Sequence, residues 1–113
     1  MSIPKSFISL YLKSLNIEVV PEYKFLPDRK FRADWYIPSL SLLIEYEGIM
    51  SAKSRHTSVT GYSKDSEKYN LATLAGYRIL RYTTMNYKDL PKHLDYLLAS
   101  PLQGVVDTKS KAD

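Results

Sequence analysis

The sequence contains no cysteine. Disulfide bridges, thiolate-bound zinc and a cysteine nucleophile are therefore excluded, and the composition is compatible with the reducing cytoplasm, where we expect the protein. No apolar run approaches the ~18 residues that cross a membrane. The N-terminal stretch also lacks the small-residue cleavage pattern of a signal peptide, so we expect neither secretion nor membrane insertion.

What is present is a chain of 113 residues, 44% hydrophobic, with a net charge of +4. That length fits one domain with a modest core, to which a second copy of the chain could add burial. The mild positive charge suits a polyanion such as a nucleic acid, although many proteins without such a partner carry it too. There are no internal repeats, and the only low-complexity piece is DTKSKAD. We predict one domain over residues 1–106 and a flexible tail over residues 107–113.

Hydrophobic periodicity predicts an α/β protein with elements in the order αβββαβα. Ser63 or Ser66 is expected to begin the second helix and Gly76 to end it. Residues 48–62 show little periodicity and are interpreted as a long loop. A meander of three strands, followed by a helix and a fourth strand, predicts a mixed four-stranded sheet flanked by helices. The expected helices cover residues 4–16, 63–75 and 90–98, and the expected strands residues 17–25, 30–37, 42–47 and 77–82.

The second and third predicted strands form a hairpin that faces carboxylates toward each other. If its turn is centred on residues 39–40, Asp34 lies opposite Glu45, and Arg32 lies opposite Glu47. The β-carbons of directly opposed residues are roughly 4.5 to 5.5 Å apart. The other face of the hairpin is apolar and should be core, including Trp35 and Ile44.

Opposed carboxylates repel each other and destabilise a sheet, and a divalent cation removes that repulsion. Three carboxylates without imidazole or thiolate suit Mg²⁺ or Mn²⁺ better than zinc, because these ions prefer oxygen ligands. Such an ion can polarise a phosphodiester and activate water. The pattern alone supports a solvated acidic strand face equally well, with Arg32 and Glu47 as a surface ion pair of little energetic weight.

The rest of the chain favours the metal site. Asp34, ten intervening residues and the tripeptide Glu45-Tyr46-Glu47 resemble the motif of the PD-(D/E)XK nuclease superfamily. The stretches PEYKFLPDRKFRADWYIPSLSLLIEYEG, RHT and GYSKDSEKYNLATLAGYRILRYT look like small phage and prophage nucleases of that superfamily, over roughly residues 20–87. The resemblance implies a restriction-endonuclease-like fold in a bacterial or phage-infected cytoplasm. It also implies that Asp34 and Glu45 are ligands of Mg²⁺ or Mn²⁺.

Glu47 departs from the motif, because the superfamily usually has lysine two residues after the metal-binding glutamate, where it contacts the attacked phosphate or its water. Some members keep glutamate there and remain active, and others recruit a lysine from elsewhere. Lys68, on the helix expected to pack near the sheet, is the candidate for a relocated lysine, and Lys64, one turn earlier, is its rival. A solvent-facing helix lysine is as good an interpretation of Lys68. The expected catalytic residues are Asp34, Glu45, Glu47 and Lys68, and the expected metal ligands are Asp34, Glu45 and Glu47.

Basic residues outside this motif are candidate DNA contacts. Lys53, Arg55 and His56 lie among serines and threonines, a composition that suits phosphate contacts but also an ordinary surface loop. His56 can equally be a general acid or base. For Tyr62 and Tyr69, packing is a better interpretation than contact with nucleic acid. The predicted nucleic-acid-binding set is Arg32, Lys53, Arg55, His56 and Lys64.

The resemblance favours a Mg²⁺-dependent endodeoxyribonuclease in which water attacks a DNA phosphodiester. A phage-type Holliday-junction resolvase is the first substrate class to consider, since small stand-alone nucleases of this fold often act on branched DNA as homodimers. A homing, nicking or restriction-like enzyme stays open. A DNA-binding module with the same fold and no turnover also stays open, favoured by the missing lysine, as does an interaction protein with a solvated acidic strand face.

Overall fold

The computed structural model describes residues 2–48 and 59–99, apart from the side chain of Tyr62. Within these ranges the elements follow the predicted order αβββαβα, which confirms the α/β class. None of the helices in these ranges is long and apolar enough to span a membrane. The predicted tail, residues 107–113, lies outside the described residues. The helices are α1 (Ile3–Ser14), α3 (Val59–Leu74) and α4 (Leu90–Ala99), and the strands are β1 (Val20–Tyr23), β2 (Ala33–Ile37), β3 (Leu42–Tyr46) and β4 (Arg78–Tyr82).

The four strands form one mixed sheet in the order β1-β2-β3-β4. The first three strands pair antiparallel, and β4 runs parallel to β3. Parallel neighbours need a crossover connection, and α3 supplies it. The predicted meander followed by a crossover helix is therefore confirmed.

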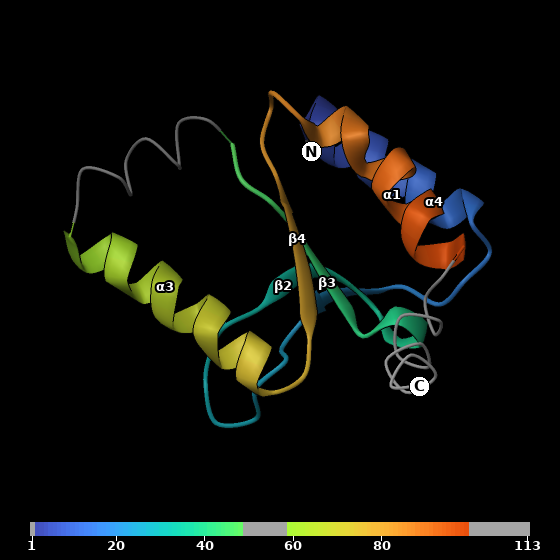
Figure 1. Ribbon diagram of the computed structural model, residues 1–113. Coiled ribbons are helices and arrows are strands. Elements are labelled where there is room, and N and C mark those ends of the chain that lie inside the picture. Colours follow the sequence, from blue (N-terminus) through green and yellow to red (C-terminus); the bar gives the residue numbers. More distant parts are fainter. Residues whose placement is uncertain (1, 49–58, 100–113) are drawn as a thin grey trace, which may run out of the picture.

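Helices cover both faces of the sheet. α1 and α4 lie side by side over one face, and α3 lies over the other (Figure 1). The larger group of buried apolar side chains lies on the α1 and α4 side and comprises Ile8, Leu12, Trp35, Ile37, Leu40, Leu42, Ile44, Tyr82, Leu90 and Leu94. The smaller group on the α3 side comprises Phe25, Ala33, Leu43 and Ala72. Because the apolar core on the α3 side is small, polar side chains can gather between α3 and the sheet.

The β2–β3 hairpin has the predicted register. Trp35 pairs with Ile44 and Ile37 with Leu42, and these side chains belong to the larger core. A 3-10 turn, Pro38–Leu40, connects the strands, and Ser41 follows it with a φ of 49°. Continuing the register by one pair sets Asp34 opposite Glu45.

The four predicted strands are longer than the observed ones. β2 begins at Ala33, because a turn closed by the Arg29 N–H and the Leu26 carbonyl, 3.3 Å apart, precedes it. β3 ends at Tyr46, so Arg32 and Glu47 lie just beyond the strands and do not form the expected ladder pair. Similarly, β1 begins only at Val20; it contains a proline, which is tolerated because β1 is an edge strand.

α3 begins at Val59, so the prediction that residues 59–62 belong to a loop, with the helix starting at Ser63 or Ser66, is wrong. Serine, threonine and glycine in this stretch suggested a loop, yet they are compatible with the first turns of a largely polar helix.

The predicted end of α3 at Gly76 is confirmed. Gly76 has a φ of 94°, and its N–H donates to the Thr73 carbonyl while that of Tyr77 donates to the Ala72 carbonyl, both at 3.0 Å, which together make a Schellman motif.

Candidate active site

Asp34 lies on β2, and its half-buried carboxylate is held across the hairpin. Its Oδ2 atom accepts a hydrogen bond of 2.8 Å from the backbone N–H of Tyr46 on β3. Its Oδ1 atom lies 3.8 Å from Nζ of Lys5, which comes from the first turn of α1. Asp34 is therefore fixed by the partner strand and faces a lysine from the helix layer on the other side of the sheet.

Glu45, on β3, is buried with only 5% of its surface exposed. Its Oε1 atom accepts a hydrogen bond of 3.0 Å from the Tyr69 hydroxyl. Its Oε2 atom lies 2.6 Å from Nζ of Lys68. Burial raises the pKa of the Glu45 carboxyl, the Lys68 ammonium opposes that shift, and the nearby Asp34 charge adds to it. A buried carboxylate needs a neighbouring cation to stay charged, and Lys68 provides one.

Glu47 follows the last residue of β3 and is tied to β4. Its backbone N–H donates to the Tyr82 carbonyl at 2.7 Å. Its Oε2 atom accepts hydrogen bonds of 2.9 Å from both the Tyr69 hydroxyl and the Arg81 guanidinium. The Arg81 guanidinium also lies over the Tyr69 ring, 4.0 Å from its centroid. Tyr69 therefore lies between Glu45 and Glu47 and shares its one hydroxyl proton between them, and Arg81 contacts both Tyr69 and Glu47.

These side chains meet at a polar pocket of about 190 Å³ between α3 and the sheet. A larger hollow of about 490 Å³ runs along β4, but no carboxylate lines it, so it lacks the chemistry expected here. The polar pocket brings together all the predicted catalytic residues. It is lined by Arg32, Asp34, Glu45, Tyr46, Glu47, Gly48, Asp65, Lys68 and Tyr69.

The donor set of the pocket suits a hard cation, because its acidic groups offer only oxygen ligands. Asp34 lies close enough to Glu45 for its charge to raise the pKa of the Glu45 carboxyl, a repulsion that a cation would relieve. Among the described residues, however, no three acidic or histidine side chains gather closely enough to hold a metal ion. The predicted ligand set of Asp34, Glu45 and Glu47 therefore stays a prediction.

The two candidate lysines occupy different places on α3. Lys68 contacts Glu45 in the polar pocket, whereas Lys64 lines a separate hollow of about 260 Å³ beside residues 28–31. Of the predicted DNA contacts, Arg32 lines the polar pocket and Lys64 the neighbouring hollow. Three further predicted contacts, Lys53, Arg55 and His56, lie outside the described residues.

Three residues at the site were not singled out from the sequence. The sequence favours packing for Tyr69 and indicates no role for Arg81 or Lys5. Arg81 enters the site because the parallel register of β3 and β4 pairs it with Glu45. That register depends on the crossover through α3 and is not visible in either strand alone. No pattern in the sequence indicates Lys5, since it contacts Asp34 from a helix near the start of the chain.

Lys68 and Glu45 thus form a buried ion pair inside a pocket that also contains Asp34, Arg32 and a tyrosine bridging two glutamates. Comparison of this chain with protein-family models, with curated proteins and with solved structures finds no match.

Proposed function

We propose that this protein is a Mg²⁺-dependent endodeoxyribonuclease with a restriction-endonuclease-like fold. The observation that carries the proposal is the contact of 2.6 Å between Lys68 and the buried Glu45, in a pocket shared with Asp34. A lysine beside two carboxylates is the combination needed to hold a cation and to neutralise a phosphate. The mixed sheet with helices on both faces is consistent with the fold that the resemblance implies.

Asp34 and Glu45 would hold the divalent cation, which is Mg²⁺ or Mn²⁺. When bound, such an ion supplies positive charge at the phosphate and lowers the pKa of water. The protein contributes the positions of the two carboxylates. The Tyr46 N–H fixes Asp34, and the Tyr69 hydroxyl fixes Glu45.

Lys68 takes the role of the lysine that is missing after Glu45. Its ammonium group is held at the pocket by Glu45 and by the packing of α3 on the sheet. When a phosphodiester enters, this charge stabilises the negative charge that develops on the phosphate oxygens as water adds to phosphorus and one P–O bond breaks. Arg32, on the rim of the same pocket, contacts a phosphate and positions the strand.

The substrate class that we favour is branched DNA, with the protein acting as a phage-type Holliday-junction resolvase. The support is the resemblance of roughly residues 20–87 to small phage and prophage nucleases. Symmetric cleavage of a four-way junction needs two sites, so this substrate implies a homodimer.

A second candidate function is DNA binding without turnover. The pocket gives it specific support, because Glu47 stands where the motif has lysine and each of the three carboxylates already contacts a cationic side chain. In that case Lys68 would be a permanent partner of Glu45, and the pocket would never hold a metal ion.

The experiment that separates the two candidates is a cleavage assay on three substrates. A labelled four-way junction, a linear duplex and single-stranded DNA are each incubated with the protein and EDTA, Mg²⁺ or Mn²⁺, then analysed on a denaturing gel. Metal-dependent cuts that disappear in Glu45→Gln support the nuclease, and paired cuts in the junction alone support the resolvase. Intact DNA in every lane, with shifted bands on a native gel, supports the binding module.

A further inference from the structure

Glu47 stands at the position that the superfamily motif gives to lysine, and its cationic partner is an arginine, whereas those of Asp34 and Glu45 are lysines. Its side chain is only 12% exposed, and the Arg81 guanidinium lies 2.9 Å from its Oε2 atom. The Tyr69 hydroxyl donates to that same oxygen at 2.9 Å. This oxygen therefore already has one charged and one neutral donor.

Such an oxygen is a poor ligand for a metal ion. An arginine side chain stays protonated in proteins, so a cation bound to the same oxygen would lie beside a fixed positive charge. A metal ion bound through this oxygen would have to compete with the contacts that Arg81 and Tyr69 make with it. The backbone gives Glu47 little freedom to move away, because its N–H is bonded to the Tyr82 carbonyl at 2.7 Å.

Tyr69 is the link between this group and the metal site. Its ring is held under the Arg81 guanidinium, with 4.0 Å between the guanidinium carbon and the ring centroid. Its hydroxyl lies 2.9 Å from Glu47 Oε2 and 3.0 Å from Glu45 Oε1. An arginine stacked on a tyrosine ring restricts the ring, and the restricted hydroxyl in turn fixes the carboxylate of Glu45.

We propose that Glu47, Tyr69 and Arg81 form a clamp that positions Glu45, in which Glu47 is the anchor and not a third metal ligand. This inference rests on the proposed function, because it assumes that Glu45 holds a metal ion. All three are positioning residues and act through Glu45. The clamp explains why glutamate at position 47 is compatible with the site although the motif has lysine there.

The two roles of Glu47 predict different behaviour for Glu47→Gln. The glutamine amide oxygen can still accept from both Tyr69 and Arg81, so the clamp keeps its geometry. A metal ligand, by contrast, would lose its negative charge. Tyr69→Phe keeps the ring under Arg81 but removes the hydroxyl that holds Glu45.

The test is a titration of the full chain with Mn²⁺ alone, without DNA, in which free Mn²⁺ is followed by electron paramagnetic resonance. Glu47→Gln should keep the wild-type dissociation constant, Tyr69→Phe should weaken binding about tenfold, and Glu45→Gln should abolish it. Tyr96→Phe, on α4 with 73% of its surface exposed, is the matched control and should behave as wild type. Loss of Mn²⁺ binding in Glu47→Gln, or unchanged binding in Tyr69→Phe, would overturn the clamp.

If the wild type binds no Mn²⁺, that result by itself would contradict the proposed function. A second measurement then tests whether the clamp exists. Urea unfolding of Tyr69→Phe, Arg81→Gln and the double variant forms a double-mutant cycle. The clamp predicts that the shifts of the unfolding midpoint are not additive, because each substitution releases the same group. Additive shifts would overturn it.

Discussion

The ammonium nitrogen of Lys68 lies 2.6 Å from the Oε2 atom of Glu45, in a contact between α3 and β3. Both side chains are largely buried, with 16% of the lysine and 7% of the glutamate side chain exposed. Removing one partner of such a pair leaves a buried charge without compensation. The contact makes Lys68 the strongest candidate for the lysine that the sequence motif lacks.

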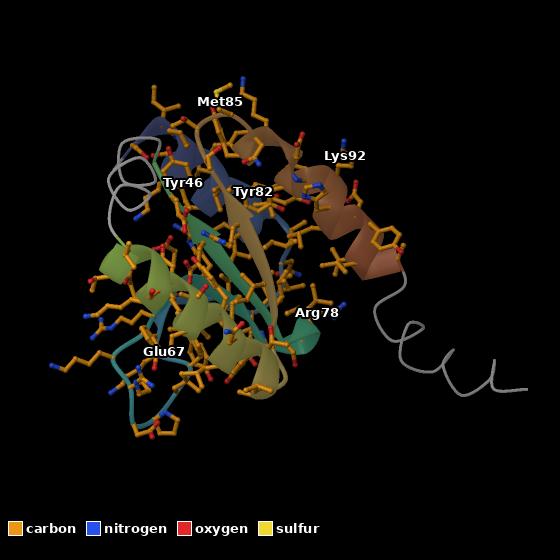
Figure 2. The ribbon with its side chains drawn as sticks, turned by 60° about the vertical axis from the view of Figure 1, so that its left-hand side comes forward. Tyr46, Glu67, Arg78, Tyr82, Met85 and Lys92 are labelled. Atoms are coloured by element: carbon orange, nitrogen blue, oxygen red, sulfur yellow. The ribbon has the colours of Figure 1, made fainter. Side chains whose placement is uncertain are left out.

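Lys68→Ala should lower the rate of DNA cleavage by about a hundredfold, the usual effect of removing one group that stabilises charge in a transition state. The matched control is Lys92→Ala. Lys92 is an exposed lysine on α4, on the other side of the sheet from Glu67 on α3 (Figure 2). Single-turnover cleavage rates check the prediction. Equal rates in both variants would show that Lys68 does not stabilise the attacked phosphate, and would leave that role to Glu47, Lys64 or water.

Affinity for DNA should fall as salt rises, because cationic side chains that bind phosphates release counterions. Arg32 and Lys64 each line a hollow beside α3 and are the predicted phosphate contacts in the described residues. Replacing either by alanine should reduce the slope of log affinity against log salt by about one. Fluorescence anisotropy in EDTA over a range of salt concentrations measures the slope. A slope equal to that of the wild type would remove that residue from the DNA contact set.

The raised pKa of Tyr77 predicts that the folded protein loses stability in alkali. Its hydrogen bond with Tyr23, whose hydroxyl oxygen is 3.3 Å away, raises the pKa of Tyr77 to about 12, and burial adds to the shift. The unfolded chain titrates near 10, so the folded state retains a proton that the unfolded state loses between pH 10 and 12. The stabilisation is complete below pH 10 and declines as pH rises toward 12. The stability difference between the wild type and Tyr77→Phe should therefore shrink over that range in chemical unfolding, and a constant difference would contradict the account.

Gly76→Ala should destabilise the protein by about 1 kcal/mol, because a left-handed backbone disfavours a β-carbon. Gly76 has a φ of 94°, and an added β-carbon would meet no atom within 4 Å. Gly48→Ala is the control, since space around it is equally open and its φ is not in the left-handed region. Urea unfolding of both variants isolates the backbone effect. Equal stabilities would show that the end of α3 does not depend on glycine.

The sequence predicts the hairpin well because strand alternation and the position of its turn act together. Burying Trp35 against Ile44 leaves one register, and that register faces Asp34 toward Glu45. The choice between the two lysines was not predictable in this way. Lys64, Lys68 and the buried Ala72 lie along one stripe of α3, and only the packing of the helix on the sheet decides which lysine reaches Glu45.

Tyr69 and Arg81 show what a sequence pattern cannot supply. Their contacts with Glu45 and Glu47 join elements that are distant in the chain, and these contacts depend on the parallel pairing of β3 with β4 across α3. The start of α3 was missed for another reason. Hydrophobic periodicity is weak in its first turns, where the helix has exposed residues such as Val59.

The most direct test of the central claim compares the wild type with Asp34→Asn on a four-way junction, with Mg²⁺ and with EDTA. Asp34 is held by a backbone hydrogen bond that asparagine can also accept, so the variant should fold and bind DNA as well as or better than the wild type. The account predicts cleavage by the wild type in Mg²⁺ alone and none by Asp34→Asn. Near-normal cleavage by Asp34→Asn, or cleavage by the wild type in EDTA, would contradict a metal-dependent site built on Asp34 and Glu45.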